Sequence, residues 1–243
     1  MKNLLLILFL SVPFAPTALA QGAPNVDDLL ASARQSAALQ KQDLKGILRK
    51  GKRKIPIALF LNRQAGNIQF QVFGAAQQWE KFHLRLKQDH FELFEINGGK
   101  TVRFPAAKLG QPIEGTDLTY EDLAMRFLYW KGGKVLGSQK VGVSDCWKIR
   151  LTNPGTEGRY KFVDVAVHKK FGALMRVTGY DFKGHAIKKF EISEIMQVDG
   201  VATLRVMRVD TIQPVSGKVI GLTRVEFDNP EGPKVGRPGS GFR

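Results

Sequence analysis

The residues of this chain that could perform chemistry do not group into a reactive set. The four histidines, His83, His90, His168 and His185, are not spaced like metal ligands, and His83 falls on the polar side of an alternating run. The sequence contains no nucleophile elbow, no phosphate-binding Walker loop and no glycine-rich dinucleotide turn. It therefore predicts a protein with no metal, no cofactor and no enzymatic activity.

The densest group of acidic side chains is formed by Asp117, Glu121 and Asp122. Carboxylates in the first turn stabilise the positive end of a helix, so a helix start explains this cluster without catalysis. Thr119 fits the N-cap position, and Asp122 stands three positions later, where a capping box has its acid. Apolar residues then recur every three or four positions, at Tyr120, Leu123, Ala124, Phe127 and Trp130. This spacing predicts one amphipathic helix that reaches Trp130.

Alternation with a period of two surrounds this helix on both sides and predicts antiparallel strands. For example, Phe82, Leu84 and Leu86 alternate with basic residues and a histidine. Asn97-Gly98-Gly99 and Asp199-Gly200 have the composition of hairpin turns. The spacing of these signals predicts about ten or eleven strands in one continuous meander.

An earlier helix is predicted from Asn25 as N-cap and an apolar stripe of Val26, Leu29, Leu30, Ala33 and Ala37. The predicted fold class is α+β, a curled antiparallel sheet or incomplete β-barrel with both helices on its concave face. A barrel of this width can leave a ligand-sized cavity. The alternative is that the two helices fill the interior.

The ends of the chain differ in composition from its middle. Residues 1–20 have the pattern of an export signal, with Lys2, the apolar run Leu4–Leu10 and the small residues of Ala18–Ala20 before a cleavage point. We expect cleavage after Ala20 and a periplasmic location. Residues 21–229 are expected to form a single domain, and residues 230–243, rich in glycine and proline, a tail without a core.

The net charge of +15 at pH 7 indicates an anionic partner. Nucleic acid, anionic lipid headgroups and lipopolysaccharide all carry the complementary charge, and export argues against nucleic acid. The alternative is a generic soluble surface with an excess of lysine. Cys146 is the single cysteine, so the chain has no internal disulfide, and its apolar neighbours predict a buried, unreactive thiol.

The candidate ligand site combines the apolar face of the central helix with apolar positions of the strands. We expect these side chains to border a lipid-sized cavity: Tyr120, Leu123, Phe127 and Trp130 of the helix, with Phe70, Leu84 and Trp147 of the strands. The alternative is that they are ordinary core residues.

Several short pieces of the sequence resemble the LolA-like family of bacterial outer membrane lipoprotein-sorting proteins. The main piece is Gly115–Leu123, with the sequence GTDLTYEDL. The others are Cys146-Trp147, the run Tyr180–Gly184 followed by Lys188-Lys189, and Asp199-Gly200 followed by Met207. The similarity spans roughly Ile55 to Asn229, which is most of the chain.

The resemblance implies an incomplete antiparallel barrel, LolA/LolB-like, that holds acyl chains in an apolar cavity under helical lids. It implies lipoproteins or lipid acyl chains as ligands, with partner proteins at the inner and outer membranes. The function expected from it is to carry or dock lipid-modified proteins between two membranes. Two alternatives remain: a basic envelope protein that binds lipopolysaccharide or an anionic membrane surface, and, ranked last, a lipid-modifying hydrolase.

Overall fold

The computed structural model describes residues 24–38, 43–62, 67–87 and 90–230. The predicted export signal and nearly all of the predicted tail lie outside these residues. The strands of the described part are β1 (Leu44–Lys50), β2 (Arg53–Asn62), β3 (Asn67–Phe73), β4 (Trp79–Leu86), β5 (Phe91–Asn97), β6 (Lys100–Arg103), β7 (Lys134–Val141), β8 (Ser144–Thr152), β9 (Phe162–His168), β10 (Leu174–Tyr180), β11 (Ala186–Val198), β12 (Val201–Ile212) and β13 (Val219–Phe227).

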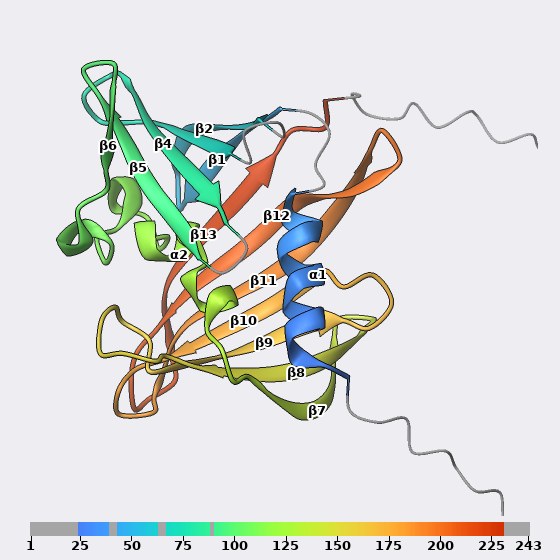
Figure 1. Ribbon diagram of the computed structural model, residues 1–243. Helices are drawn as coiled ribbons and strands as arrows, with labels where there is room; N and C mark the ends of the chain where they lie inside the picture. The colour runs from blue at the N-terminus through green and yellow to red at the C-terminus, as the bar shows by residue number, and fades with distance from the viewer. Residues whose placement is uncertain (1–23, 39–42, 63–66, 88–89, 231–243) are drawn as a thin grey trace, which may run out of the picture.

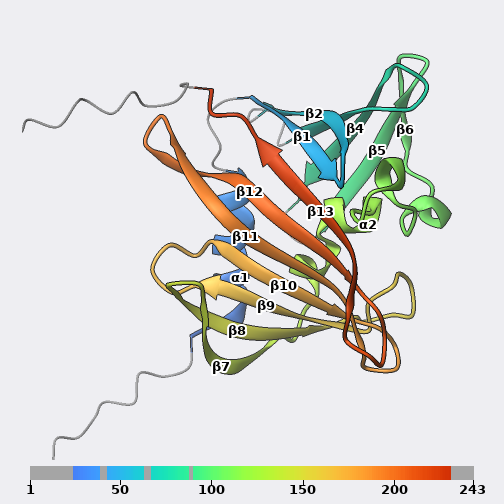
Figure 2. The same ribbon diagram turned by 180° about the vertical axis from the view of Figure 1, so that it is seen from behind.

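These strands form one antiparallel sheet of 13 strands, in the order β6-β5-β4-β3-β2-β1-β13-β12-β11-β10-β9-β8-β7. Two meanders, β1 to β6 and β7 to β13, are joined where β1 pairs with β13, with Gly46 opposite Phe227. The sheet curls strongly (Figures 1 and 2), yet within the described residues its end strands β6 and β7 do not pair with each other. The α+β prediction of a curled, incomplete barrel describes this arrangement.

One helix lies against the concave side of the sheet. In Figure 1, α1 (Val26–Ala38) crosses in front of the strands of the second meander, and Figure 2 shows it behind them. Leu30 and Ala33 of α1 are almost fully buried in the main core, as the predicted apolar stripe requires. In the described part of the chain, no helix is long and apolar enough to cross a membrane.

The opposite face of the sheet is held by ion pairs between neighbouring strands. Arg150 Nε lies 2.7 Å from Asp164 Oδ1 across β8 and β9. Arg176 Nε lies 2.8 Å from Glu191 Oε2 across β10 and β11. Cross-strand pairs of opposite charge stabilise a sheet modestly and fix which residues stand opposite one another. Cys146 is buried on this face, in a small apolar cluster apart from the main core.

Two hairpin turns predicted from sequence are confirmed. Gly98 and Gly99 join β5 to β6, with Asn97 opposite Lys100. Asp199 and Gly200 join β11 to β12, and their φ angles of 49° and 73° are both positive. This is the left-handed conformation that a two-residue turn needs to match the twist of its strands.

The prediction of about ten or eleven strands is too low, since the described residues alone form 13. The sequence analysis missed β7, which is an edge strand with mostly exposed or half-exposed side chains. An edge strand does not need an apolar face, so the alternation that reveals central strands is weak here. Gly137, with a φ of 127° and a shift in pairing beside it, interrupts the pattern further.

The prediction of one continuous central helix is also wrong. Short 3-10 turns η1 (Ala106–Lys108) and η2 (Ile113–Gly115) precede α2 (Tyr120–Ala124), and a further 3-10 turn, η3 (Arg126–Tyr129), follows it. Met125 lies between α2 and η3 in the left-handed conformation, with φ 46° and ψ 41°, and ends the α-helix. The predicted capping box is confirmed: Asp122 N–H donates to Thr119 Oγ1, and Thr119 N–H donates to Asp122 Oδ2.

Candidate functional site

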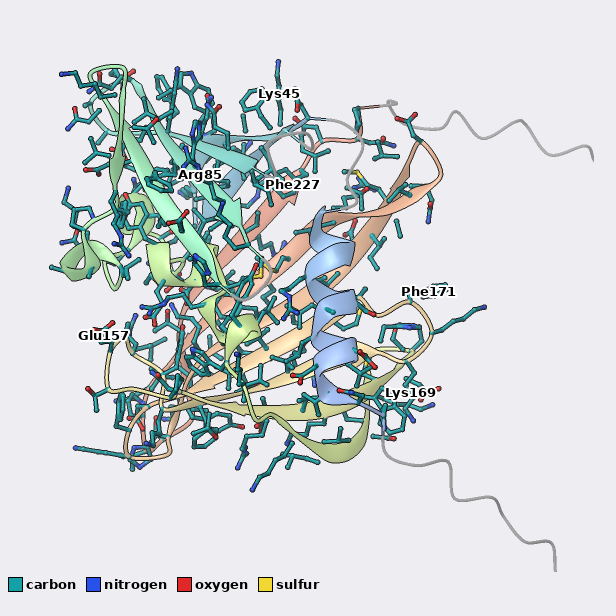
Figure 3. All side chains as sticks on the ribbon, viewed as in Figure 1. Lys45, Arg85, Glu157, Lys169, Phe171 and Phe227 are labelled. Carbon is teal, nitrogen blue, oxygen red and sulfur yellow. The ribbon has the colours of Figure 1, made fainter. Side chains whose placement is uncertain are left out.

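An apolar cavity of about 260 Å³ lies inside the curl of the sheet. It is bounded by α1, by the segment that carries α2 and η3, and by strands of both meanders. Nearly all of its wall is apolar, and the second meander supplies to it Leu174, Val177, Phe190, Leu204, Met207, Val225 and Phe227, among others. Figure 3 labels Phe227, which lies at the end of β13. The arrangement can surround an apolar chain.

Four of the predicted site residues line this cavity: Phe70, Leu84, Leu123 and Phe127. They come from β3, β4, α2 and η3, so the structure brings together side chains from distant parts of the sequence. The break at Met125 does not prevent this, and Met125 itself lies on the cavity wall. Whether these side chains bind a lipid stays a prediction.

Tyr120 lies outside the cavity wall, in an aromatic cluster beside it. Its ring centre is 5.1 Å from that of Phe82 and 4.8 Å from that of Phe104. Its hydroxyl donates to Glu80 Oε2 at 3.4 Å. Burial, and then the nearby Glu114 carboxylate, raise the pKa of Glu80 above its ordinary value, against the smaller opposing effect of the Tyr120 hydrogen bond. Tyr120 therefore anchors α2 to the first meander.

The two predicted tryptophans also lie away from the cavity wall. Trp130 follows η3, is half-buried against the core, and donates its backbone N–H to Phe127 O. Trp147 is on β8, and its ring lies under Lys169 Nζ at 4.1 Å from the ring centre. Trp130 comes after the break at Met125, and Trp147 meets a lysine of the β9–β10 turn, and the periodic pattern of the sequence gives neither of these contacts.

The remaining lining residues of β10 to β13 were not singled out in the sequence analysis. The sequence around them shows only the alternation of ordinary strands, as for Leu174, Phe190 and Leu204. Their alternation places them on one face of the sheet, but only the curl brings that face against α1. The signal that could have found them is this face assignment, applied strand by strand to the second meander.

A buried polar network fixes the loop before α2. The carboxylate of Asp117 accepts hydrogen bonds from Thr211 Oγ1 at 2.7 Å and from Thr223 Oγ1 at 2.9 Å. Lys50 Nζ lies 3.3 Å from the same carboxylate. Asp117 N–H donates in turn to Thr223 Oγ1 at 2.9 Å. Asp117, which belongs to the acidic cluster that predicts a helix start, therefore also links the loop to β1, β12 and β13.

A second part of this network surrounds Lys188, which is only 2% exposed. Its Nζ donates to the backbone oxygen of Asp117 and lies 3.7 Å from Asp122 Oδ2. The hydroxyl of the buried Tyr160 donates to Asp122 Oδ1 at 2.5 Å. Burial lowers the pKa of Lys188 below its ordinary value, although the carboxylates of Asp122 and Asp117 act in the opposite direction.

The sequence does not indicate which residues form this network. Lys188 stands two positions before Phe190 on β11, so alternation places both side chains on the same, buried face of the sheet. The α2 segment covers Lys188, and each of these polar atoms has a partner from another element. Because each of these polar groups has a hydrogen-bond or ion-pair partner within the network, the network holds the α2 segment in a fixed position against the sheet.

The attachment of α1 is mainly apolar. Besides the buried Leu30 and Ala33, Arg34 Nη1 donates to Leu128 O at 2.6 Å, and its guanidinium lies 5.1 Å from the ring centre of Tyr129. Both partners belong to η3, so α1 and η3 close the same side of the cavity.

The described residues contain no group of three or more histidine, cysteine, aspartate or glutamate side chains arranged to hold a metal ion. His168 instead accepts hydrogen bonds at Nδ1 from the backbone N–H groups of Lys170 and Phe171, at 3.1 and 3.2 Å. It thereby shapes a turn.

Three comparisons place the chain among known proteins. A family model described as "-like: Uncharacterized protein" matches residues 83–234, which is more than half of the chain. The comparison with curated proteins gave no match.

Solved structures of similar fold come from several bacteria. A putative outer membrane lipoprotein-sorting protein domain from Vibrio parahaemolyticus has a TM-score of 0.62 at 13% identity, over 84% of this chain and 92% of that one. A LolA superfamily protein from Nitrosomonas europaea has a TM-score of 0.61 at 12% identity, over 85% and 93%. A DUF1329 family protein from Desulfovibrio piger has a TM-score of 0.60 at 16% identity, over 84% and 90%.

At these identities the likeness to solved structures concerns the fold. It is the curled, unclosed sheet around an inner helix that the sequence pieces at Gly115–Leu123 and Asp199-Gly200 had indicated, and the family model covers both pieces. The chain belongs to the family that this model describes, and its fold is that of LolA-like proteins.

Proposed function

We propose that this protein binds an acyl chain of a lipid, or of a lipid-modified protein, in the apolar cavity. The observation that carries the proposal is the cavity of about 260 Å³ with an apolar wall and a helical cover. The likeness in fold to a lipoprotein-sorting domain supports the same function, as do the sequence pieces that resemble the LolA-like family. With the export signal predicted for residues 1–20, the ligand would be carried through the periplasm, between partner proteins at the inner and outer membranes.

The free energy of burial is sufficient for such a ligand. Removing one methylene from water is worth about 0.8 kcal/mol, so an acyl chain of about sixteen carbons gains on the order of 12 kcal/mol before binding costs. A carrier of this kind needs an apolar sleeve and a cover that opens. It needs no cofactor and no catalytic group, and we assign none.

The size of the cavity limits its load in this conformation. Pockets that hold drug-sized ligands measure roughly 300–1,000 Å³, and the cavity here, at about 260 Å³, is slightly smaller. We infer room for one acyl chain at a time. A ligand with several chains would require α1 and η3 to move apart from the sheet.

A second candidate function is favoured by the surface charge. The net charge is +15, and Lys52, Arg53 and Lys54 are all exposed at the β1–β2 turn. A protein of this kind could bind lipopolysaccharide or an anionic membrane surface without extracting an acyl chain. Salt separates the two functions, because ionic attachment is screened at high ionic strength and acyl burial is not.

Uptake of a fluorescent fatty-acid probe tests the cavity. We expect Leu123→Trp, which fills the cavity wall, to weaken probe binding more than tenfold while the protein still folds. Leu136→Trp is the matched control, since Leu136 is 47% exposed on β7 and does not line the cavity. Equal probe binding by both variants, or equal losses of binding and stability, would contradict the proposal.

The natural ligand can be identified by mass spectrometry of what co-purifies with the protein. Acylated peptides or phospholipid that remain bound in 1 M salt, where the Debye length is about 3 Å, would favour the carrier function. Lipopolysaccharide that is released by salt, with nothing left in the cavity, would favour the second candidate.

A further inference from the structure

Two neighbouring turns at one end of the sheet expose apolar side chains. Val143, in the β7–β8 turn, is 97% exposed, and Phe171, in the β9–β10 turn, is 67% exposed. The turns lie side by side because β8 pairs with β9, and Lys169 N–H donates to Asp145 O at 2.9 Å. We call Val143, Lys169, Lys170 and Phe171 the tip surface.

The tip surface has a defined shape. The ring of Phe171 packs on that of His168, with ring centres 4.7 Å apart. His168 Nδ1 accepts from the backbone N–H groups of Lys170 and Phe171, which fixes the turn. Figure 3 shows Phe171 and Lys169 on the outside of the molecule, to one side of α1. The aromatic ring is therefore presented to solvent by a structured turn.

Positive charge surrounds these apolar side chains. Lys169 Nζ lies over the ring of Trp147, and Lys170 Nζ lies 5.3 Å from the ring centre of Phe171. Within the part of the chain that the structure describes, no ion pair of Lys169, Lys170 or the nearby Lys140 is found, and the acidic residue beside them is Asp145, which stands opposite Lys140. Exposed aromatic and apolar groups ringed by lysines are complementary to an anionic lipid surface.

The tip surface also adjoins the cavity. Gly172, with a φ of 64°, lies so close to α1 that a Cβ on it would stand 2.6 Å from Ser32 Cβ. The next residues along the chain, Ala173 and Leu174, line the cavity wall. The turn that carries Phe171 therefore touches both the helical cover and the rim of the cavity.

The opposite end of the sheet provides a contrast. Phe182, in the β10–β11 turn, is 46% exposed and lies under Lys161 Nζ, so a similar chemical pair exists there. That end is the one at which the Asp117 network closes the interior, and Phe182 does not adjoin the cavity. At the tip surface, by contrast, exposed apolar side chains beside lysines lie at the rim of the cavity.

We propose that the tip surface docks the protein on an anionic lipid bilayer, with Phe171 and Val143 in the headgroup region and the lysines against lipid phosphates. This goes beyond binding an acyl chain, because it assigns the face that meets the membrane. Docking itself needs no cavity, whereas passage of an acyl chain between bilayer and cavity rests on the proposed function.

Co-sedimentation with vesicles tests the docking. The purified protein is expected to bind vesicles of phosphatidylcholine containing about one third phosphatidylglycerol and to bind neutral phosphatidylcholine vesicles weakly. Phe171→Ser should lower the partition coefficient about tenfold, from the lost apolar transfer. Replacing Lys169 and Lys170 by glutamine should lower it about fivefold for each lysine.

Matched controls keep the test specific. Phe182→Ser, and a double change of Lys52 and Lys54 to glutamine, alter the same residue types at the opposite end of the sheet and should change vesicle binding less than twofold. Thermal unfolding checks that each variant is folded. Uptake of the fatty-acid probe without vesicles should be unchanged in the tip variants, which separates failure of docking from failure of the proposed function. Absence of vesicle binding by the unaltered protein, or equal losses in tip and control variants, would overturn the docking proposal.

Discussion

The cavity is bounded in two different ways at its two ends. Toward the β1–β2 turn, Asp117 ties the loop before α2 to three strands through Lys50, Thr211 and Thr223. Toward the β9–β10 turn, α1 covers the cavity through buried apolar contacts and one arginine that reaches η3. The first boundary is a polar network and the second is mainly apolar.

This difference indicates which boundary opens. Moving the loop at Asp117 would leave buried charged groups without partners, which costs several kcal/mol. Moving α1 would expose apolar surface, and an incoming acyl chain can replace the contacts that α1 gives up. We therefore infer that ligand enters on the side of α1, while the Asp117 side stays closed.

The largest expected effect comes from breaking the polar network. Asp122→Ala removes the cap of α2, the acceptor of Tyr160 and the carboxylate beside Lys188. We expect the free energy of unfolding, measured by urea denaturation, to fall by about 3–5 kcal/mol, since a buried ammonium loses its counter-charge. Asp145→Ala, at an exposed aspartate, is the control and should change stability little. A similar loss in both variants would remove the distinction between the two ends.

A smaller effect is expected at the α1 end. Arg34→Ala removes the hydrogen bond to Leu128 O and the contact with Tyr129. A hydrogen bond to a charged group is worth about 1.5–3 kcal/mol, so the closed position of α1 should weaken by up to that amount. In stopped-flow mixing, we expect the fatty-acid probe to enter about ten times faster.

Arg103→Ala serves as the control for Arg34→Ala, because Arg103 is exposed on the edge strand β6. An unchanged entry rate in Arg34→Ala, with an intact fold, would mean that α1 is not the cover that moves.

The smallest expected effect is a pH dependence of the stability that the Asp117 carboxylate contributes. Burial alone would raise the pKa of Asp117, but the hydrogen bonds from Thr211 and Thr223 and the ammonium of Lys50 outweigh it and hold the pKa below its ordinary value of 3.8. A carboxylate with a lowered pKa in the folded state stabilises the protein above the unfolded pKa. That stability is lost as the pH falls below 3.8 and through the folded pKa.

Asp117→Asn isolates this contribution from those of other carboxylates. The difference in unfolding free energy between the unaltered protein and Asp117→Asn should be constant from neutral pH down to about pH 4 and then shrink. A difference that stays constant at still lower pH would show that ionisation of Asp117 does not stabilise the loop.

Local signals made much of this fold predictable. The turn at Asp199-Gly200 and the capping box of Thr119 and Asp122 each depend on residues within four positions of one another, and both are confirmed. The inner strands bury one face, so their alternation is strong. The edge strand β7 buries little, and its alternation is too weak to reveal it.

The site was less predictable because it depends on contacts between distant segments. Leu123 and Phe127 were found from helical spacing, although Met125 breaks the helix between them. Lys188 and Tyr160 reach Asp122 only after the sheet has curled, so the alternation that places Lys188 on the buried face of β11 does not give its partners. The same curl decides that Phe70 lines the cavity whereas Trp147 meets Lys169 instead.

The unpaired edges of the sheet carry a consequence for assembly. An open edge strand offers free backbone N–H and C=O groups on which a second copy could add its own strand, and growth of this kind leads to fibres. Here β6 has only four residues, all exposed, and both Lys100 and Arg103 at its ends are charged. On β7, the irregular pairing at Gly137 and the lysines Lys134 and Lys140 oppose the same addition. In the open form that we infer, with α1 moved away from the sheet, these edges would discourage aggregation.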